Sequence, residues 1–435
     1  MSTFDRRQVL RTMALAAVGC AAGPAAAPSG LTPSGQASRL NRDDESFLDD
    51  LIRRGCLYFY EQGSNTTGQV LDRARYDLGG ARDPRRMASI AATGFGLTAL
   101  CIADNHGYIP HEKVVERVRT TLEWHLNLMP EVHGFFYHFT DIETGKRWDR
   151  VELSSIDSAL LLCGVLTARA YFADEKIQSL ARQIYERVDW PWMLNGGPSF
   201  SMGWNPRSGF LSARWNHYCE LMMIYLLAIG SPTHPVSPET WKSFSRPVIH
   251  YGGLSYISGD DPIFTHQYSQ AWFDFRHKRD ANTDYFANSV TATRAHKAFC
   301  LSMPKWYDND FWGITASDSM RGYTVWGGPP SRGQIDGTVV PSAAAGSLPF
   351  LPGDCLGVLR AMRANYPQAW GRYGFVDAFN PSAHWVNPDV LGIDLGIGVL
   401  MAENLRSELV WETFMRNAEP ERAMQLVGFR PDGLA

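Results

Sequence analysis

Carboxylic acids set among apolar residues are the strongest chemical signal in this sequence. Glu220 lies in the run Cys219-Glu-Leu-Met-Met-Ile-Tyr225, where a charged, unpaired carboxylate would be costly. Burial of this kind raises the pKa of a carboxyl group, and a raised pKa is what a general acid needs near neutral pH. A structural glutamate paired with Arg214 or Arg276 is the alternative, and it stays open here.

A second acid is needed if Glu220 is to take part in hydrolysis. Asp394 has apolar neighbours on both sides, and Asp157 opens another apolar segment with Glu152 and Asp149 shortly before it. General acid–base catalysis needs one carboxyl group that holds a proton and a second one that is charged. We expect Glu220 as the acid and Asp394 as the base, followed as base candidates by the other three. Asp157 could equally cap its helix, and the two acids before it could be solvated loop charges.

Aromatic residues make up 12% of the chain, with 14 Trp, 17 Tyr and 22 Phe. Several of the tryptophans stand beside Asn, His or Gly in loop-like segments, which suits stacking on the apolar faces of sugars. Each alone is as easily explained by packing, and the two loop aspartates in the set could be turn residues. The candidates for substrate binding are Trp204, Trp215, His266, Gln267, Arg276, Trp312, Asp318, Trp326, Arg332, Asp336 and Trp385.

The sequence gives little support for nucleic-acid binding or for metal- and cofactor-dependent chemistry. A net charge of −4 without a long basic run argues against nucleic-acid binding, which depends on phosphate neutralisation. HExxH, P-loop, paired CxxC and Gly-x-Ser-x-Gly motifs are absent. Gly94-Phe-Gly-Leu-Thr-Ala99 matches the dinucleotide fingerprint in form but stands inside an apolar helix pattern rather than after a strand. We therefore expect no metal and no cofactor.

The first 27 residues have the pattern of a twin-arginine export signal. Arg6 and Arg7 precede a weakly apolar run that is too short to span a membrane, and Ala27 ends a possible cleavage site. Cys20 follows a lipoprotein-like box, so lipidation at Cys20 and cleavage after Ala27 both stay open. We expect a periplasmic or exported protein with no transmembrane span. Lipidation at Cys20 would make it a membrane-anchored lipoprotein.

Six cysteines remain after Cys20, each alone in apolar surroundings. A twin-arginine substrate folds before export, in a reducing compartment, so buried free thiols are expected rather than disulfides.

Apolar periodicity predicts about twelve helices that alternate between strongly apolar and amphipathic. Only 135–139 and 322–326 resemble strands. Such alternation over some 370 residues predicts an all-α (α/α)6 barrel with long aromatic-rich loops; an open solenoid would need a repeat that is not found. The expected organisation is a signal peptide (1–27), a linker (28–44), the barrel domain (45–420) and a tail (421–435), in a monomer. Beyond the first four helices, around 45–56, 87–103, 114–126 and 159–172, we expect helices at 175–187, 215–229, 237–246, 284–302, 341–347, 353–365, 390–404 and 406–417.

Several motifs occur in a characteristic order. They include Gly134-Phe-Phe-Tyr-His-Phe139, Glu152-Leu-Ser-Ser-Ile-Asp157, Phe264-Thr-His-Gln-Tyr268, Phe311-Trp-Gly-Ile-Thr-Ala-Ser-Asp318 and Trp370-Gly-Arg-Tyr-Gly-Phe375. Together they resemble the bacterial glucoamylase-like domain, a superfamily that includes the endo-β-1,2-glucanases of glycoside hydrolase family 144. The resemblance covers roughly residues 45–417.

The resemblance implies an (α/α)6 barrel and an inverting hydrolase that acts on β-1,2-glucan. By motif, Glu220 matches the candidate acid of the family, and the acids of 149–157 match a second acidic cluster. Cys219 and Leu395 stand where relatives are expected to carry a small polar residue and Gln. These departures leave open whether the substrate is long glucan or short oligosaccharide.

The sequence therefore predicts an exported, metal-free glycoside hydrolase. Two other classes stay in view: a polysaccharide lyase, since helical toroids also host β-elimination, and a non-catalytic glycan-binding lipoprotein with Trp-rich loops. The clustered acids disfavour the lyase, which needs cations to neutralise uronates. Buried carboxylates would serve no purpose in the binding protein.

Overall fold

The computed structural model describes residues 40–259 and 262–432. The predicted export signal around Arg6 and Arg7, the lipidation site at Cys20 and the cleavage site at Ala27 lie outside the described residues. They therefore remain predictions.

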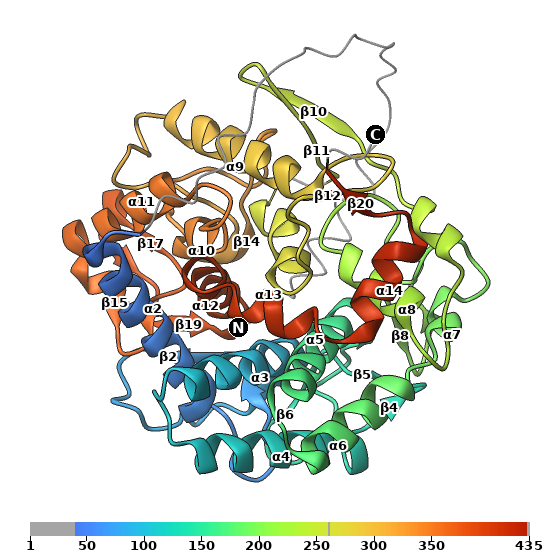
Figure 1. The fold of residues 1–435 in the computed structure, drawn as a ribbon. Helices are drawn as coiled ribbons and strands as arrows, with labels where there is room; N and C mark the ends of the chain where they lie inside the picture. Colours follow the sequence, from blue (N-terminus) through green and yellow to red (C-terminus); the bar gives the residue numbers. More distant parts are fainter. Residues whose placement is uncertain (1–39, 260–261, 433–435) are drawn as a thin grey trace.

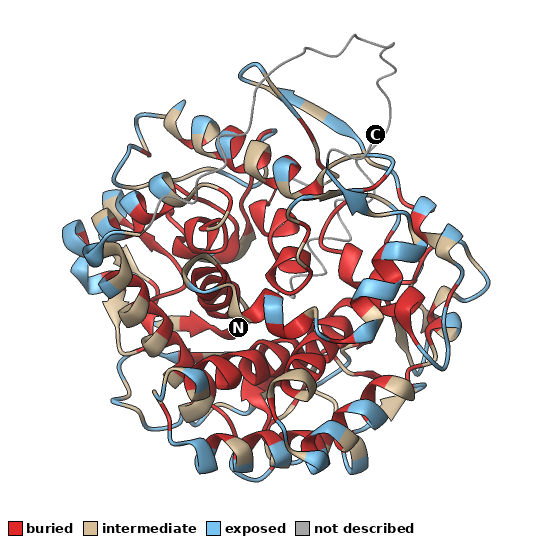
Figure 2. Cartoon of the chain, viewed as in Figure 1, coloured by how far each residue is buried: buried red, intermediate tan, exposed pale blue. Residues whose placement is uncertain are grey.

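Two concentric layers of helices form a closed ring (Figure 1). The outer helices bury one stripe and expose the other face, whereas the inner helices are buried nearly all round (Figure 2). Outer helices are α2 (Arg42–Glu61), α4 (His111–Asn127), α6 (Glu175–Glu186), α9 (Tyr285–Leu301) and α11 (Pro352–Asn365). Inner helices are α3 (Ile90–Asn105), α5 (Ser155–Tyr171), α8 (Met222–Gly230), α10 (Pro341–Ala345) and α12 (Gly392–Arg406), with the 3-10 turns η2 (Ile263–His266) and η3 (Tyr268–Ala271) in the sixth inner position.

The double ring is the predicted (α/α)6 barrel, and its layers follow from the sequence. An inner helix packs against neighbours on every side, so it needs apolar residues all round; an outer helix faces water on one side. The remaining helical segments are α7 (Trp190–Leu194), α13 (Leu409–Phe414), α14 (Ala418–Leu426), η1 (Pro238–Lys242), η4 (Pro367–Ala369) and η5 (Pro381–Ala383).

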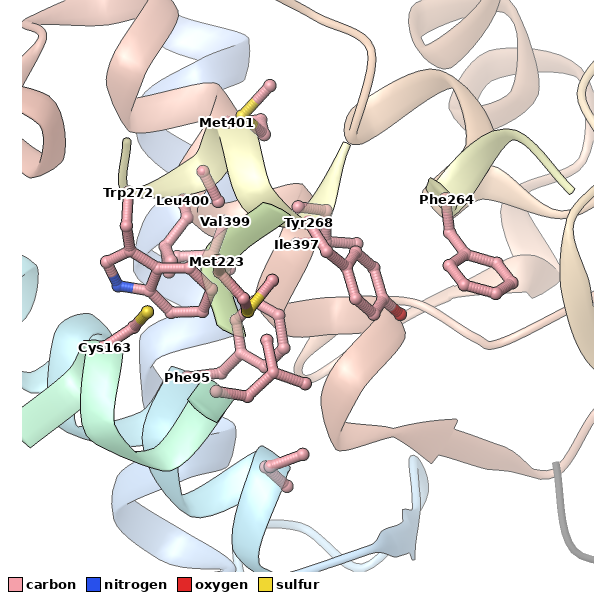
Figure 3. Close-up of a cluster of buried hydrophobic side chains, with 14 of the residues drawn as sticks. Phe95, Cys163, Met223, Phe264, Tyr268, Trp272, Ile397, Val399, Leu400 and Met401 are labelled. Carbon is pink, nitrogen blue, oxygen red and sulfur yellow. The ribbon is translucent and has the colours of Figure 1, made fainter. Parts of the chain in front are cut away.

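The centre of the ring is filled by side chains from the inner elements. Phe95 of α3 packs on Tyr268 and Trp272, with ring centroids 5.7 Å and 4.9 Å away. Cys163 of α5 and Met223 of α8 complete the same cluster, together with a row of α12 residues (Figure 3). The core therefore ties together helices from both halves of the chain.

Gly94 and Gly164 allow α3 and α5 to touch backbone to backbone. A Cβ on Gly94 would lie 2.2 Å from the carbonyl oxygen of Leu160, and one on Gly164 would lie 2.1 Å from that of Gly94. The glycine pattern at 94–99 thus serves helix packing, which agrees with the sequence-based rejection of a dinucleotide site.

The strands are short and mostly form two-stranded hairpins in the loops. The two predicted strand regions contain β5, part of β6 and β14. The β10–β11 hairpin projects from the ring (Figure 1). The strands are β1 (Val70–Leu71), β2 (Arg73–Arg75), β3 (Met87–Ser89), β4 (Glu131–Val132), β5 (Phe135–Phe136), β6 (Phe139–Asp141), β7 (Leu153–Ser154), β8 (Gly203–Asn205), β9 (Gly209–Phe210), β10 (Val248–Tyr251), β11 (Leu254–Ile257), β12 (Lys278–Arg279), β13 (Ala316–Ser319), β14 (Gly322–Val325), β15 (Trp370–Gly371), β16 (Gly374–Phe375), β17 (Phe379–Asn380), β18 (Trp385–Val386), β19 (Asp389–Leu391) and β20 (Arg430–Pro431).

Two expected helices and the expected tail differ most from the structure. The helix expected at 215–229 begins only at Met222, and the one expected at 237–246 is the short 3-10 turn η1. Helix α14 occupies the start of the segment predicted as a tail. Its Ala423 and Met424 are buried, and it packs against α8 where Gly230 leaves room for the backbone of Glu419.

All six cysteines in the described residues are buried free thiols, as predicted, and none forms a disulfide. Within the same residues, no helix combines the length and the apolar character needed to cross a membrane.

Candidate active site

Three of the predicted acids lie at or beside the starts of inner helices. Asp157 is the third residue of α5, Asp394 is the third residue of α12, and Glu220 lies in the turn just before α8. Their side chains belong to residues only 6%, 6% and 3% exposed. Asp157 and Asp394 thus lie in the first turns of their helices, where unpaired N–H groups and the positive end of the helix dipole favour a negative charge.

Hydrogen bonds between loops hold these helix starts in fixed relation. The hydroxyl of Ser155 contacts the carbonyl oxygens of Ser201 (2.8 Å) and Met202 (3.0 Å), and it also accepts the indole N–H of Trp215. At α12, the amide of Gly392 donates to the carbonyl of Asp72 at 2.8 Å. The bond at Ser155 joins the start of α5 to the segment before α8, and the bond at Gly392 joins the start of α12 to the residue between β1 and β2.

Glu220 is held by its main chain. Its carbonyl oxygen accepts the Ser269 hydroxyl at 2.7 Å, and the oxygen of that hydroxyl accepts the amide of Met223 at 3.1 Å. The two arginines considered as structural partners bind elsewhere: Arg214 donates to main-chain carbonyls, and Arg276 to the carboxylates of Asp274 and Glu408.

His138 lies between the two acids of the 149–157 segment that are buried. Its Nδ1 is 3.7 Å from Oε1 of Glu152, and its Nε2 is 3.6 Å from Oδ1 of Asp157. Ser154 is the N-cap of α5, since its hydroxyl oxygen accepts the Asp157 amide at 3.0 Å, and the same hydroxyl contacts Oδ2 of Asp157. The capping role considered for Asp157 thus belongs to Ser154, and the Asp157 carboxylate faces a histidine. Asp149, in contrast, is exposed in a turn with φ of 45°.

Asp394 borders a second group of acids. With Asp377 it lines a small pocket of about 30 Å³ between α2, α10 and α12. Oδ2 of Asp377 accepts the amide of Asp318 at 2.8 Å and the side-chain amide of Asn387 at 3.3 Å. Arg73 in turn donates to the carboxylate of Asp318 at 2.6 Å.

Sequence reasoning included Asp318 and Asp394 but missed the residues that connect them. Asp377, Asn387 and Arg73 lie in short strands or turns of unremarkable composition. Likewise His138 was seen only as part of a motif. The signal that could have singled them out is tertiary, since the partners of Asp377 are 10 and 59 residues away.

His266 and Gln267 are both buried. Burial lowers the pKa of His266 to about 3, so the ring is neutral near pH 7, and its Nδ1 lies 3.3 Å from the hydroxyl of Tyr218. The amide of Gln267 donates to the carbonyl of Ala343 and the hydroxyl of Ser347. Gln267 thus fastens α10 to η2.

The predicted tryptophans divide by burial. Trp215, Trp312 and Trp326 are buried, whereas Trp204 and Trp385 are half-buried and offer part of their rings to solvent. The ammonium group of Lys297 lies over the ring of Trp312, 5.7 Å from the ring centre. This contact and its burial fit a packing role for Trp312.

Three further candidates have structural partners. Arg276 stacks over Trp411 and binds two carboxylates, so its contacts account for it without a sugar. Asp336 accepts both the amide and the hydroxyl of Thr338, as turn residues do. Arg332 pairs through its main chain with Gly327 in the loop after Trp326. Among the described residues, no three His, Cys, Asp or Glu side chains group as metal ligands would.

Comparison with known proteins agrees with this fold. Residues 212–418 match the family model Glycoamylase, described as "Putative glucoamylase". This match and the (α/α)6 fold make the chain similar to glucoamylase-like proteins, in agreement with the resemblance seen in the sequence.

Within this class the chain is similar to proteins named for β-1,2-glucans. It is 28% identical, over 88% of its length, to an exo β-1,2-glucooligosaccharide sophorohydrolase (non-reducing end) of Parabacteroides distasonis, and it spans 58% of that curated relative. An endo-β-1,2-glucanase of Chitinophaga pinensis, in complex with sophorotriose and glucose, superposes with a TM-score of 0.82 and 26% identity, covering 89% of this chain and 98% of the other. A β-1,2-glucanase structure from P. distasonis gives a TM-score of 0.79 and 26% identity, covering 88% and 60%.

Proposed function

We propose that this protein hydrolyses β-1,2-linked glucan or its oligosaccharides with inversion of configuration. The observation that carries this proposal is the set of buried carboxylates, Asp157, Glu220 and Asp394, at the starts of three inner helices of a glucoamylase-like barrel. The names of the similar proteins supply the β-1,2 linkage.

In the proposed reaction Glu220 is the general acid and Asp394 the general base. Glu220 gives its proton to the glycosidic oxygen as the bond to the anomeric carbon breaks. Asp394 takes a proton from a water molecule, whose oxygen forms the new bond from the opposite face. The helix start favours the charged form of Asp394, as a base requires, and the apolar α8 segment favours a protonated Glu220.

The pair formed by Glu152 and Asp157 around His138 is the second acidic cluster of the site. Both acids are buried, and the carboxylate of Asp157 contacts the hydroxyl of Ser154 at the start of α5, which suits positioning of sugar hydroxyls or of the attacking water. The half-buried rings of Trp204 and Trp385 are the proposed stacking surfaces for sugar rings.

Export through the twin-arginine route, to the periplasm, forms part of the proposal. The Arg6-Arg7 pattern supports it, and so do six buried cysteines that form no disulfide. A fusion of residues 1–44 to a folded reporter should reach the periplasm, and Arg6→Lys with Arg7→Lys should retain the reporter in the cytoplasm.

The decisive experiment is product analysis with the purified protein on β-1,2-, β-1,3- and β-1,6-glucans. We expect reducing sugar only from the β-1,2-glucan, and the size of the first products distinguishes endo from exo action. Proton NMR of the first turnovers should show the α-anomer. Release of the β-anomer would contradict inversion, an unsaturated product absorbing in the ultraviolet would indicate a lyase, and binding without any cleavage would indicate a glycan-binding protein.

A further inference from the structure

Asp377 is a buried carboxylate for which the proposed mechanism has no role. It lies between β16 and β17 and is 4% exposed. Its amide donates to the carbonyl of Asp389 at 3.0 Å, so the backbone is fixed. One carboxylate oxygen, Oδ2, accepts hydrogen bonds from Asp318 and Asn387, as described above.

The other oxygen has a different environment. Within the described residues, Oδ1 of Asp377 is buried and accepts no hydrogen bond. A charged oxygen in such a place would be costly, because nothing replaces the water it has lost. The pocket that Asp377 lines is otherwise mainly apolar, and its polar members are Ser342 and Asp394.

The charges around Asp377 also disfavour its ionised form. Burial, the carboxylate of Asp394 and the carboxylate of Asp318 all raise the pKa of Asp377 well above its ordinary value. The amide of Asp318 and the guanidinium of Arg73 act in the opposite direction but do not outweigh them. Arg73 is already shared between Asp72 and Asp318.

We propose that Asp377 is a positioning residue that carries a proton at neutral pH and donates a hydrogen bond from Oδ1 to the carboxylate of Asp394. This inference rests on the proposed function, in which Asp394 is the base. A neutral acid beside a charged one removes like-charge repulsion, and its hydrogen bond favours the charged form of the acceptor. Asp377 thereby keeps Asp394 ionised and oriented toward the attacking water.

Two substitutions test this role through the pH dependence of kcat/KM on β-1,2-glucan. Asp377→Asn keeps a neutral donor, so the acidic limb of the profile should stay within about 0.3 pH units of wild type. Asp377→Ala removes the donor, so the apparent pKa of Asp394 should rise and the acidic limb should move up by about one unit, the size typical of a hydrogen bond to a charged group.

An ionised Asp377 would give the opposite sign. Both substitutions would then remove a negative charge beside Asp394, and the acidic limb would move to lower pH. A purely structural Asp377 would lower the melting temperature and leave the limb in place. Either result would overturn the proposal.

Asp280 provides a matched control. It is a buried aspartate whose carboxylate accepts hydrogen bonds from Trp241 and Tyr285, away from the pocket. Asp280→Asn should lower stability and leave the pH profile unchanged, which separates a loss of folding from a change in the titration of Asp394.

A measurement independent of activity keeps this inference separate from the proposed function. The carbonyl stretch of a protonated carboxylic acid is distinct from that of a carboxylate, so the infrared difference between wild type and Asp377→Asn at pH 7 should contain a protonated-acid band. If wild type cleaves no glucan, the proposed function fails while the band still reports on Asp377. Absence of the band would overturn the inference. This test does not need Asp377→Ala, so it also applies if that variant does not fold.

Discussion

The indole N–H of Trp215 donates to the hydroxyl of Ser155 at 2.8 Å, across 60 residues of sequence. Ser155 is the first residue of α5 and stands two residues before Asp157. Trp215 stands five residues before Glu220, and its carbonyl accepts the hydroxyl of Tyr225 from α8 at 2.7 Å. One tryptophan therefore connects the segments that carry two of the three proposed site acids.

Trp215→Phe should separate positioning from folding. Phe keeps most of the ring and loses the hydrogen bond, which costs about 1 kcal/mol of stability. Because a small misplacement of reacting groups lowers turnover, we expect kcat on β-1,2-glucan to fall by about tenfold, with little change in KM. Trp272→Phe is the control, since its indole donates to Thr98 at 3.0 Å inside the core. It should lose similar stability with normal kcat, and equal effects of the two changes would contradict the positioning role.

Glu220→Gln should remove the general acid and leave the fold intact. The amide is nearly isosteric and needs no buried charge, so the melting temperature should change little. Turnover should fall by about 10²–10⁴-fold. Glu403→Gln is the matched control, because Glu403 is fully buried and binds His106 at 2.9 Å. It should be destabilised and remain active. A destabilised but fully active Glu220→Gln protein would end the assignment.

The contact between α3 and α5 predicts opposite effects for two helical glycines. Gly94→Ala would place a Cβ 2.2 Å from the Leu160 carbonyl oxygen, so we expect a loss of about 1–3 kcal/mol or more in the free energy of unfolding. Gly357 of α11 is exposed, with nothing within 4 Å of an added Cβ. Gly357→Ala should gain about 0.5–1 kcal/mol from helix propensity. Urea unfolding measures both, and equal signs would contradict the packing.

Buried neutral histidines should make the fold sensitive to mild acid. Burial lowers the pKa of His125 to about 4, below the value of about 6.5 in the unfolded chain. Between these values the unfolded state binds more protons. The contribution to stability is therefore complete above pH 6.5 and is lost as pH falls toward 4, amounting to about 3 kcal/mol. The pKa of His296 is lowered in the same direction, also to about 4.

His125→Gln should accordingly flatten the pH dependence of unfolding. Between pH 8 and pH 5, the free energy of unfolding should fall less for the variant than for wild type. Urea unfolding at each pH measures both values. The exposed His250 is the control, and His250→Gln should leave the wild-type slope unchanged. A parallel slope for His125→Gln would show that another group causes acid lability.

Much of the barrel could be predicted because the distribution of apolar residues around a helix shows how many of its sides are buried. The segments around Phe95 and Leu161 are apolar on all sides and became inner helices, whereas the stripe from Phe47 to Cys56 became one face of an outer helix. The start of α8 could not be predicted in this way. Residues 215–221 contain no Gly or Pro that would mark a helix boundary. Their main chain nevertheless follows a non-helical path, because it is hydrogen-bonded to Ser245, Ser269 and Tyr225.

Some residues of the candidate site can be recognised from their neighbours in sequence, whereas others depend on long-range contacts. An acid with apolar neighbours, such as Glu220 or Asp394, can be recognised in the sequence as buried. Asp377 could not be recognised, because its importance arises from Asp318 and Asp394, which other loops bring to it. The contacts of Arg276 are likewise partly long-range, since it binds Glu408, 132 residues away.

Closure of the ring has a consequence for how the protein acquires its site. Strand β19, immediately before the helix of Asp394, pairs with β2, and Arg54 donates to the carbonyl of Gly371 across 317 residues. Such contacts give the chain a high contact order, because a long loop must close before they form. Helices α2 to α8 can gather early from neighbours in sequence, but Asp394 is seated only when the last helices reach the first. In refolding from denaturant, helical content should therefore return well before any enzymatic activity.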